Sequence, residues 1–323
     1  MEYKALICIT TCNRLNEVKK YILPYIEFSN KEEPFSFLLS LDGKNKEYID
    51  FCNEYKIPLL YSDEREGVGL SKNRVLKQFP NFDYYFFVED DIELVNEKIF
   101  SLFINIFINT NYHHFSLSHR LNAIRVEKVG SVQLTHNNYG GGQFNFYTKD
   151  GLNKVGGWNP YFAKYRRFGH TEHTYRFYHA GLTPSPFIFI DEARNMFINH
   201  DPPHVTNLEM VLENPTSELI PEEEELLRQK TTYCLLTTLS PMHFNGFDMK
   251  YNSDINDFLG SNKQKYAFVK DSERRKCFSE FYFFKFNEER NIFYKTYFFA
   301  SSFVLWPLNR HLKHFVKKKL GLV

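Results

Sequence analysis

The sequence predicts an α/β fold built around a mainly parallel sheet, and three observations predict it. Short apolar runs alternate with segments of helical periodicity through about the first hundred residues, as in successive βαβ units. Polar clusters with the sequences TTCNR, LDGK and EDD follow three of the expected strands. The chain has 323 residues, 43% of them hydrophobic and 24% charged, which suits one large domain or a domain and a half and excludes wholesale disorder.

The first part of the chain supplies the expected sheet. Residues 4–10 form a mostly apolar, β-branched run that is typical of a buried parallel strand, and residues 10–14 then supply polar groups able to cap a helix. The second strand stops at Asp42 and Gly43. In order, we expect strands at residues 4–10, 35–41, 59–62 and 83–88 and helices at 17–26, 46–55 and 70–79.

The pattern changes after an expected helix at residues 99–108. A glycine-rich segment, residues 140–142, leads into an alternating strand that reaches residue 147. A further helix is expected at residues 171–180, because Gly181 is a good residue to follow a helix end. Pro221 and the four glutamates after it open another helix in the usual way, with proline first and acids in the first turn.

Charge and cysteine content exclude several classes of protein. The five cysteines are odd in number and form no CxxC pair, which predicts reduced thiols and a cytoplasmic location. We expect no secretory signal and no transmembrane span, because no run of 18 apolar residues occurs. Residues 290–323 carry seven of the 40 basic residues and no acid, which leaves 33 basic against 39 acidic residues in the rest of the chain. The acidic body argues against nucleic acid as a partner.

Glu89, Asp90 and Asp91 follow an expected buried strand. Three successive carboxylates cannot all enter a core without partners. A hard divalent cation prefers carboxylate oxygens and often completes its shell with substrate phosphates, so a Mg²⁺ or Mn²⁺ site is one interpretation. An acidic loop that solvates the strand end is the other. The carboxyl edge of a parallel sheet is where ligands bind, and TTCNR, LDGK and EDD all fall there.

These segments resemble the nucleotide-binding half of GT-A fold glycosyltransferases, especially family 2. The similarity lies in TTCNR, LSLDGK, GVGLSKNRVL and YYFFVEDDIEL, and the stretch from GGGQFNFY to YHAGL is similar to the acceptor half. It covers roughly residues 3–205. Departures are a transposed Asn73 and Arg74 and a Glu in the first position of the DXD motif. An exposed helix face is the alternative for Lys72 and Arg74. The resemblance implies a donor site formed by Thr10, Thr11, Asn13, Arg14, Asp42, Lys72, Arg74, Glu89 and Asp90, with a Mn²⁺ or Mg²⁺ ion on Asp91.

The acceptor half offers a candidate general base in Glu172, which could deprotonate an acceptor hydroxyl. The alternative is a first-turn acid paired with Arg176 four residues on. Trp158 and His170 are the candidate acceptor-binding residues, although a core role is the favoured alternative for Trp158. Some GT-A enzymes, which this segment resembles, complete their metal shell with a late histidine, and His200 or His204 could serve. A loop with exposed histidines is the alternative. A separate zinc site is a further interpretation. Its ligands would be His170 and His173, three residues apart, together with either His179 or His200. The zinc-binding pattern HExxH is absent.

The resemblance implies metal-dependent transfer of a sugar from a nucleotide-sugar, with a UDP-sugar as the expected donor. The acceptor would be a hydroxyl of a glycan or lipid-linked molecule, the transfer inverting, and the setting surface polysaccharide synthesis. A nucleotidyltransferase or other nucleotide-dependent enzyme and a non-catalytic sugar-nucleotide binding module are the alternatives.

The expected domain spans residues 1–230, with a donor half at 1–100 and an acceptor half at 101–230, followed by a helical extension at 231–323.

The basic tail predicts a contact with a membrane surface. Residues 297–308 are apolar but too short to span. Apolar residues then recur at helical spacing up to Leu320, with Lys317, Lys318 and Lys319 mostly elsewhere around the helix. This pattern is typical of an interfacial helix on an anionic leaflet. A terminal helix packed on the body is the alternative. We therefore expect a peripheral contact of residues 297–323 with the inner face of the cell membrane.

Overall fold

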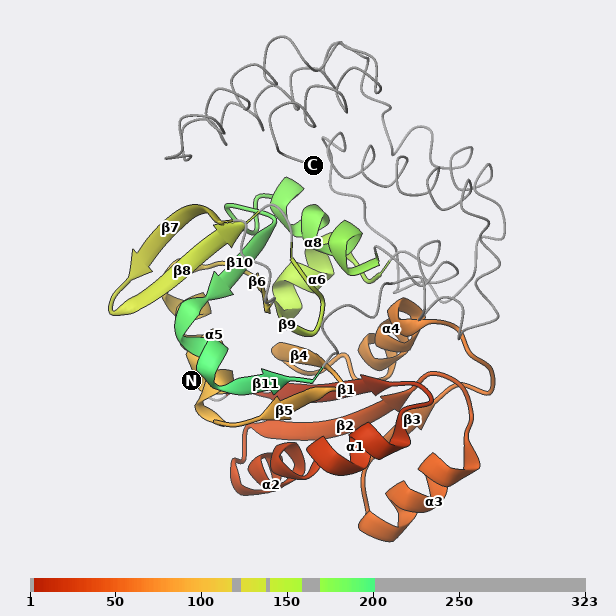
Figure 1. Cartoon of the computed structure of the whole chain (residues 1–323). Coiled ribbons are helices and arrows are strands. Elements are labelled where there is room, and N and C mark those ends of the chain that lie inside the picture. Colours follow the sequence, from red (N-terminus) through yellow and green to blue (C-terminus); the bar gives the residue numbers. More distant parts are fainter. Residues whose placement is uncertain (1–2, 118–122, 138–139, 159–168, 201–323) are drawn as a thin grey trace, which may run out of the picture.

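A computed structural model describes residues 3–117, 123–137, 140–158 and 169–200. Its centre is a six-stranded sheet in the order β3-β2-β1-β4-β9-β6 (Figure 1). The first four strands of that order are parallel neighbours, whereas β9 runs antiparallel between β4 and β6. The strands are β1 (Ala5–Thr11), β2 (Phe35–Leu41), β3 (Leu59–Tyr61), β4 (Tyr84–Glu89), β6 (His114–Leu117) and β9 (Phe144–Thr148). The expected α/β fold with a mainly parallel sheet is confirmed.

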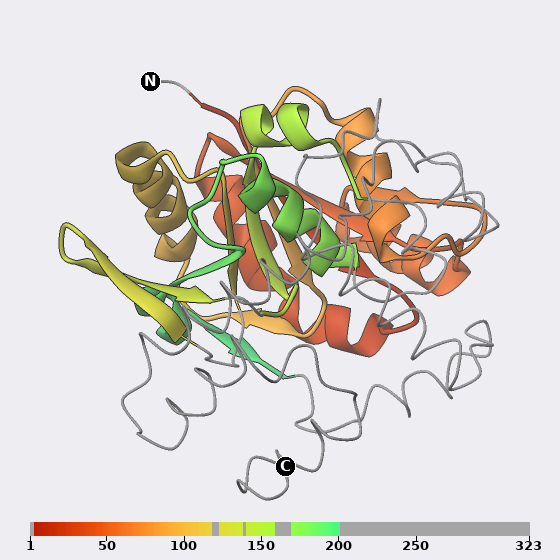
Figure 2. The same cartoon turned by 90° about the horizontal axis from the view of Figure 1, so that it is seen from above.

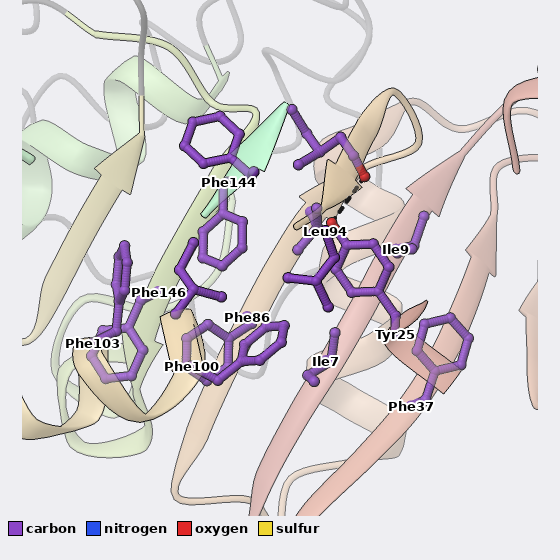
Figure 3. Packing of buried hydrophobic residues seen from close by; sticks show 14 of the residues in the cluster. Ile7, Ile9, Tyr25, Phe37, Phe86, Leu94, Phe100, Phe103, Phe144 and Phe146 are labelled. Carbon is purple, nitrogen blue, oxygen red and sulfur yellow. Dashed lines mark hydrogen bonds between the residues drawn. The ribbon is translucent and has the colours of Figure 1, made fainter. Parts of the chain in front are cut away.

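Helices cover both faces of this sheet, because successive side chains of a strand point to opposite faces. On one face Ile7 and Ile9 pack with Tyr25 and Phe100 in a large aromatic core (Figure 3), and the Tyr25 hydroxyl donates to the Ile92 carbonyl at 2.9 Å. The helices on this side are α1 (Leu15–Tyr21), α2 (Leu23–Lys31), α3 (Lys46–Tyr55) and α5 (Lys98–Thr110). On the other face lie α4 (Val68–Gln78), α6 (Lys149–Val155) and α8 (Gly169–His179).

One expected helix is divided. Residues 17–26 fall in two helices, α1 and α2, which meet at Ile22. Pro24 lies in the first turn of α2, where its missing N–H breaks no helical hydrogen bond. By contrast, α3 has the expected bounds, and the side chain of Asn45 caps it by accepting from the amides of Glu47 and Tyr48 at 2.9 and 3.4 Å.

Several strands, both short and long, were not predicted from the sequence. β7 (Ala123–Val129) and β8 (Val132–Asn137) form a hairpin that extends away from the central sheet (Figure 2), and β10 (Phe187–Ile190) pairs with β8. β5 (Ile92–Leu94) pairs with β11 (Phe197–Asn199), and the 3-10 helix η1 (Asp191–Asn195) connects β10 to β11. The β5–β11 pair brings residues near 200 beside the strand end that carries Asp91.

Some expectations fall outside the described residues. They are the domain boundary at residue 230, the helix that begins at Pro221, the extension at 231–323, the tail at 297–323 and the candidate ligand His204. Among the helices that the structure does describe, none has the length and hydropathy needed to cross a membrane.

Candidate functional site

The polar clusters after β1, β2 and β4 meet at one edge of the sheet, as expected. Thr10 is paired in register with Glu89, and Thr11 with Leu41. The Thr11 hydroxyl donates to Asp90 Oδ2 at 2.6 Å. The Asp42 amide donates to the Thr11 carbonyl at 3.0 Å. The carboxyl ends of three parallel strands thus bring these polar side chains together, and Thr10, Thr11, Asp42 and Asp90 are all buried.

Arg14 joins two of the three acids. Its Nη1 lies 3.1 Å from Asp90 Oδ1 and 3.0 Å from Asp91 Oδ2. The Arg14 side chain is 30% exposed, whereas the side chains of Asp90 and Asp91 are 5% and 3% exposed. Burial raises the pKa of Asp90 to about 6, against the opposing effects of Arg14 and of the Thr11 hydrogen bond. The acids are therefore set into the protein, and the arginine covers them.

One carboxylate oxygen of Asp91 accepts no hydrogen bond from the described residues. Oδ2 accepts from Arg14, but Oδ1 is buried and has no hydrogen-bond partner among the described residues. An unpaired carboxylate oxygen out of contact with water is costly. It is the kind of atom that a divalent cation binds. The residues present thus fit a Mn²⁺ or Mg²⁺ ion on Asp91, even though no group of three or more His, Cys, Asp or Glu side chains in the described part of the chain is arranged as a complete metal site.

Tyr48, on α3, holds the loop after β1 in place. Its hydroxyl accepts from the Arg14 amide at 2.8 Å and lies 2.8 Å from the Thr11 hydroxyl. Because Thr11 donates its own proton to Asp90, Tyr48 is the donor of that second bond. Asn13 adopts a left-handed backbone conformation, φ 55°, and the Thr10 hydroxyl donates to the Val88 carbonyl at 3.4 Å. Sequence analysis missed Tyr48, whose only signal is a polar tip on the buried face of α3.

Asp42 lies at the expected edge, and its carboxylate binds the protein's own backbone. Oδ1 accepts from the amides of Glu66 and Gly67 at 2.7 and 3.0 Å, and Oδ2 accepts from Gly67 at 3.0 Å. Arg65 Nε is 4.0 Å from Oδ2. Asp42 therefore fixes the loop that leads into α4. Its negative charge near the start of that helix is also favourable.

Two basic side chains of α4 are buried. Lys72 and Arg74 are only 3% and 6% exposed, so the alternative of an exposed helix face is wrong. Lys72 Nζ lies 5.8 and 5.2 Å from the ring centroids of Phe87 and Trp158. Burial lowers the pKa of Lys72, and the charge of Glu89 opposes that effect. Arg74 pairs with Glu66 through Nη2, while its buried Nη1 has no partner within the described ranges.

Trp158 lies in the core on this side of the sheet. Its ring is 2% exposed and packs edge-on against Phe87 and Tyr147 at centroid distances of 5.2 and 5.4 Å. The side chain of Asn73 fixes the backbone of Trp158. Asn73 Nδ2 donates to the Trp158 carbonyl, and Asn73 Oδ1 accepts from the Trp158 backbone amide, both at 2.7 Å. These contacts are those expected of a core residue, the alternative that the sequence favoured for Trp158. A role in acceptor binding stays a prediction without a supporting contact.

Glu172 forms the ion pair that the sequence offered as the alternative to a base. Its Oε1 lies 2.8 Å from Arg176 Nε, and Oε2 accepts from Arg176 Nη2 at 3.1 Å. Both side chains are almost fully buried. Burial raises the pKa of Glu172, and Arg176 opposes the rise. Arg176 also donates to the carbonyls of Val155 and Gly157, so the pair joins α8 to the turn after α6.

His170 lies beside the glycine-rich approach to β9. A Cβ built on Gly142 would come within 2.9 Å of His170 Cγ, so glycine is needed for the close approach. Gln143, the next residue, accepts from the Glu89 amide at 2.8 Å, which connects this segment to the acids. Burial lowers the pKa of His170 to about 4, and the nearby charge of Lys72 adds to that effect. The neutral imidazole is therefore the dominant form at pH 7.

His200 reaches the acids through its backbone. Its amide donates to the Asp91 carbonyl at 2.9 Å. Its ring stacks on Tyr21 with centroids 4.4 Å apart, and Nε2 lies 2.7 Å from Glu93 Oε2. The imidazole thus pairs with a carboxylate other than Asp91. His173 is engaged elsewhere, 2.9 Å from the Gly156 carbonyl, and these contacts give no support to the separate zinc site.

Comparison with known proteins finds no matching family model and no matching curated protein. Solved structures do match. A mannosyltransferase from Pyrobaculum calidifontis, in complex with GDP-Man and Mn²⁺, is 12% identical over 57% of this chain and 55% of its own, with a TM-score of 0.46. TarS 1–349 from S. aureus, in complex with UDP-GlcNAc, is 13% identical over 87% of this chain and 81% of its own, with a TM-score of 0.48. At these identities and scores the likeness assigns neither a family nor an activity.

Proposed function

We propose that the chain is a metal-dependent glycosyltransferase of GT-A fold that moves a sugar from a nucleotide-sugar, a UDP-sugar in the first instance, to a hydroxyl acceptor. The observation that carries the proposal is Asp91 Oδ1, which is buried at the carboxyl edge of the sheet and has no partner among the described residues. That edge is where such sheets bind ligands. The strand order, with antiparallel β9 beside β4, also supports the proposal.

Asp91 would hold a Mn²⁺ or Mg²⁺ ion through Oδ1. When bound, the ion neutralises the charge that develops on the diphosphate as the glycosidic bond breaks. A cation held by a single protein carboxylate has coordination positions left for water and phosphate oxygens. This explains why an incomplete set of protein ligands suits a diphosphate substrate.

The chain's own cations would bind and orient the donor. Arg74 Nη1 is a buried donor with no partner in the described part of the chain, and an anionic oxygen would satisfy it. Lys72 carries its ammonium over two aromatic rings near Glu89, where a phosphate would favour the charged form against burial. The loop of Thr11, Asn13 and Arg14, held by Tyr48, would lie beside the nucleotide.

The first experiment is a panel of thermal shifts. Wild type is combined with UDP, GDP, UDP-GlcNAc or GDP-Man, each with Mn²⁺, Mg²⁺ or EDTA. We expect a metal-dependent rise in Tm with one nucleotide. Asp91→Asn should abolish it, whereas Asp50→Asn, on the exposed part of α3, should keep it. Absence of a shift with every combination would refute the donor site.

Product analysis separates the two other classes. A glycosyltransferase releases free nucleoside diphosphate from a nucleotide-sugar, whereas a nucleotidyltransferase releases pyrophosphate from a nucleoside triphosphate. The strand-end acids would suit either reaction. Binding of a nucleotide-sugar without turnover, even with glycan or lipid-linked acceptors present, would instead favour the binding module.

We also propose an inverting transfer to a glycan or lipid-linked acceptor in surface polysaccharide synthesis, at the cytoplasmic face of the membrane. The basic segment at residues 297–323 supports the membrane contact and no other part of this proposal. Co-sedimentation of the full chain with vesicles tests it. Binding should require anionic lipid, fall with salt, and weaken when Lys317→Glu, Lys318→Glu and Lys319→Glu are combined. Equal binding to neutral vesicles would contradict the electrostatic contact.

A further inference from the structure

Arg14 contacts both Asp90 and Asp91, the acids at the proposed cation site. One nitrogen, Nη1, lies within 3.1 Å of Asp90 Oδ1 and 3.0 Å of Asp91 Oδ2. The guanidinium therefore supplies locally the positive charge that two buried carboxylates require. Its backbone is fixed as well, because the Arg14 amide donates to Tyr48 at 2.8 Å. Contacts of both its backbone and its side chain therefore hold Arg14 beside the two acids.

This arrangement leaves the acids only partly satisfied. Asp91 Oδ1 is buried and, within the described ranges, has no hydrogen-bond partner, although the other oxygen of the same carboxylate binds Arg14. A divalent cation on Oδ1 would lie across one carboxylate from the guanidinium. Two positive groups at that separation repel strongly inside a protein, where screening is weak.

A diphosphate changes this balance. Its negative charges attract the divalent cation and Arg14 together, and Arg14 can donate its remaining N–H groups to phosphate oxygens. We propose that Arg14 acts as an internal counter-cation, which disfavours binding of a divalent cation by itself and makes cation uptake depend on the simultaneous presence of an anionic diphosphate. This inference rests on the proposed function for the identity of the diphosphate. Arg14 thus couples the metal to the donor.

Metal binding without turnover provides the test. The full-length protein is titrated with Mn²⁺ alone, and free Mn²⁺ is measured by electron paramagnetic resonance. The titration is repeated with UDP. We expect Arg14→Gln to bind Mn²⁺ alone at least about tenfold more tightly than wild type, which corresponds to ~1.4 kcal/mol. The factor by which UDP strengthens Mn²⁺ binding should fall in the same variant.

Three variants show whether charge is the cause. Arg14→Lys keeps the charge and should retain the weak affinity of wild type for Mn²⁺ alone. Arg65→Gln is the matched control, because Arg65 is 29% exposed, against 30% for Arg14, but lies near Asp42; it should not change Mn²⁺ affinity. Asp91→Asn, added to Arg14→Gln, should remove the gain. Thermal unfolding of each variant confirms that it is folded.

The inference is overturned if folded Arg14→Gln binds Mn²⁺ alone no more tightly than wild type. It is also overturned if Asp91→Asn leaves the gain intact, because the cation would then bind elsewhere. Failure of the proposed function looks different. In that case UDP would not affect Mn²⁺ binding to any variant, while the titrations with Mn²⁺ alone would still decide whether Arg14 opposes the cation.

Discussion

The substitution Glu172→Gln distinguishes a structural acid from a catalytic one. In the structure the carboxylate makes two contacts with Arg176, at 2.8 and 3.1 Å, and both side chains are nearly inaccessible to water. The substituted amide would keep the shape of the side chain but remove its charge. The guanidinium of Arg176 would stay buried beside the carbonyls of Val155 and Gly157 without the charge of Glu172.

The expected cost is large because a buried cation loses its counter-charge. Removing one partner of a buried ion pair typically destabilises a protein by about 3–5 kcal/mol. Urea unfolding measures it, with the change read from Cm at constant m. Asp50→Asn is the control, since Lys46 and Asp50 form an equally spaced pair that is 86% and 60% exposed. That variant should unfold at nearly the same urea concentration as wild type.

If Glu172 is structural, the Glu172→Gln variant should lose unfolding free energy, while the turnover of its folded fraction should fall little. Loss of turnover with unfolding within about 1 kcal/mol of wild type would refute it and would restore Glu172 as the general base, for which a loss of about 10²–10⁴ is typical. Measuring both quantities on one preparation prevents confusion between the two roles.

Three further variants test the fold around the site. Asp42→Ala should destabilise by about 2–3 kcal/mol in urea unfolding, because the buried amide of Gly67 loses a charged acceptor; a change under about 0.5 kcal/mol would show that water replaces it. Burial lowers the pKa of His114 to about 3, so this residue takes up its proton first in the unfolded chain as the pH falls, and its own share of the stability present above about pH 6.5 should decline by ~1.4 kcal/mol per pH unit toward pH 4. His114→Gln should flatten that slope by one proton in unfolding titrations, and an unchanged slope would contradict the assignment. Gly151→Ala should cost about 1–3 kcal/mol in thermal unfolding, because its Cβ would lie 2.6 Å from Phe177 Cε1; a stabilised variant would mean that the ring moves freely.

The local pattern of the sequence was enough to predict the sheet of the donor half. β2 and α3 have the expected bounds, because an apolar strand that ends at Asp42 and a helix capped by Asn45 are specified by adjacent residues. The meeting of TTCNR, LDGK and EDD also followed from sequence, since parallel strands bring their carboxyl ends to one edge. Short strands such as β11, with three residues, carry too little pattern to be recognised.

The partners of the charged side chains were decided only by the tertiary structure. Nothing local shows that Arg14 meets Asp91, 77 positions away, or that Asp42 binds amides 24 and 25 positions later. The first-turn acid Glu172 could have been exposed, but packing against the turn after α6 buries it with Arg176. The spacing of apolar residues along a segment indicates which of its residues face the core, because each residue is selected for burial at its own position. Charge pairing depends on distances between remote segments, and these are fixed only when the strands and helices pack together.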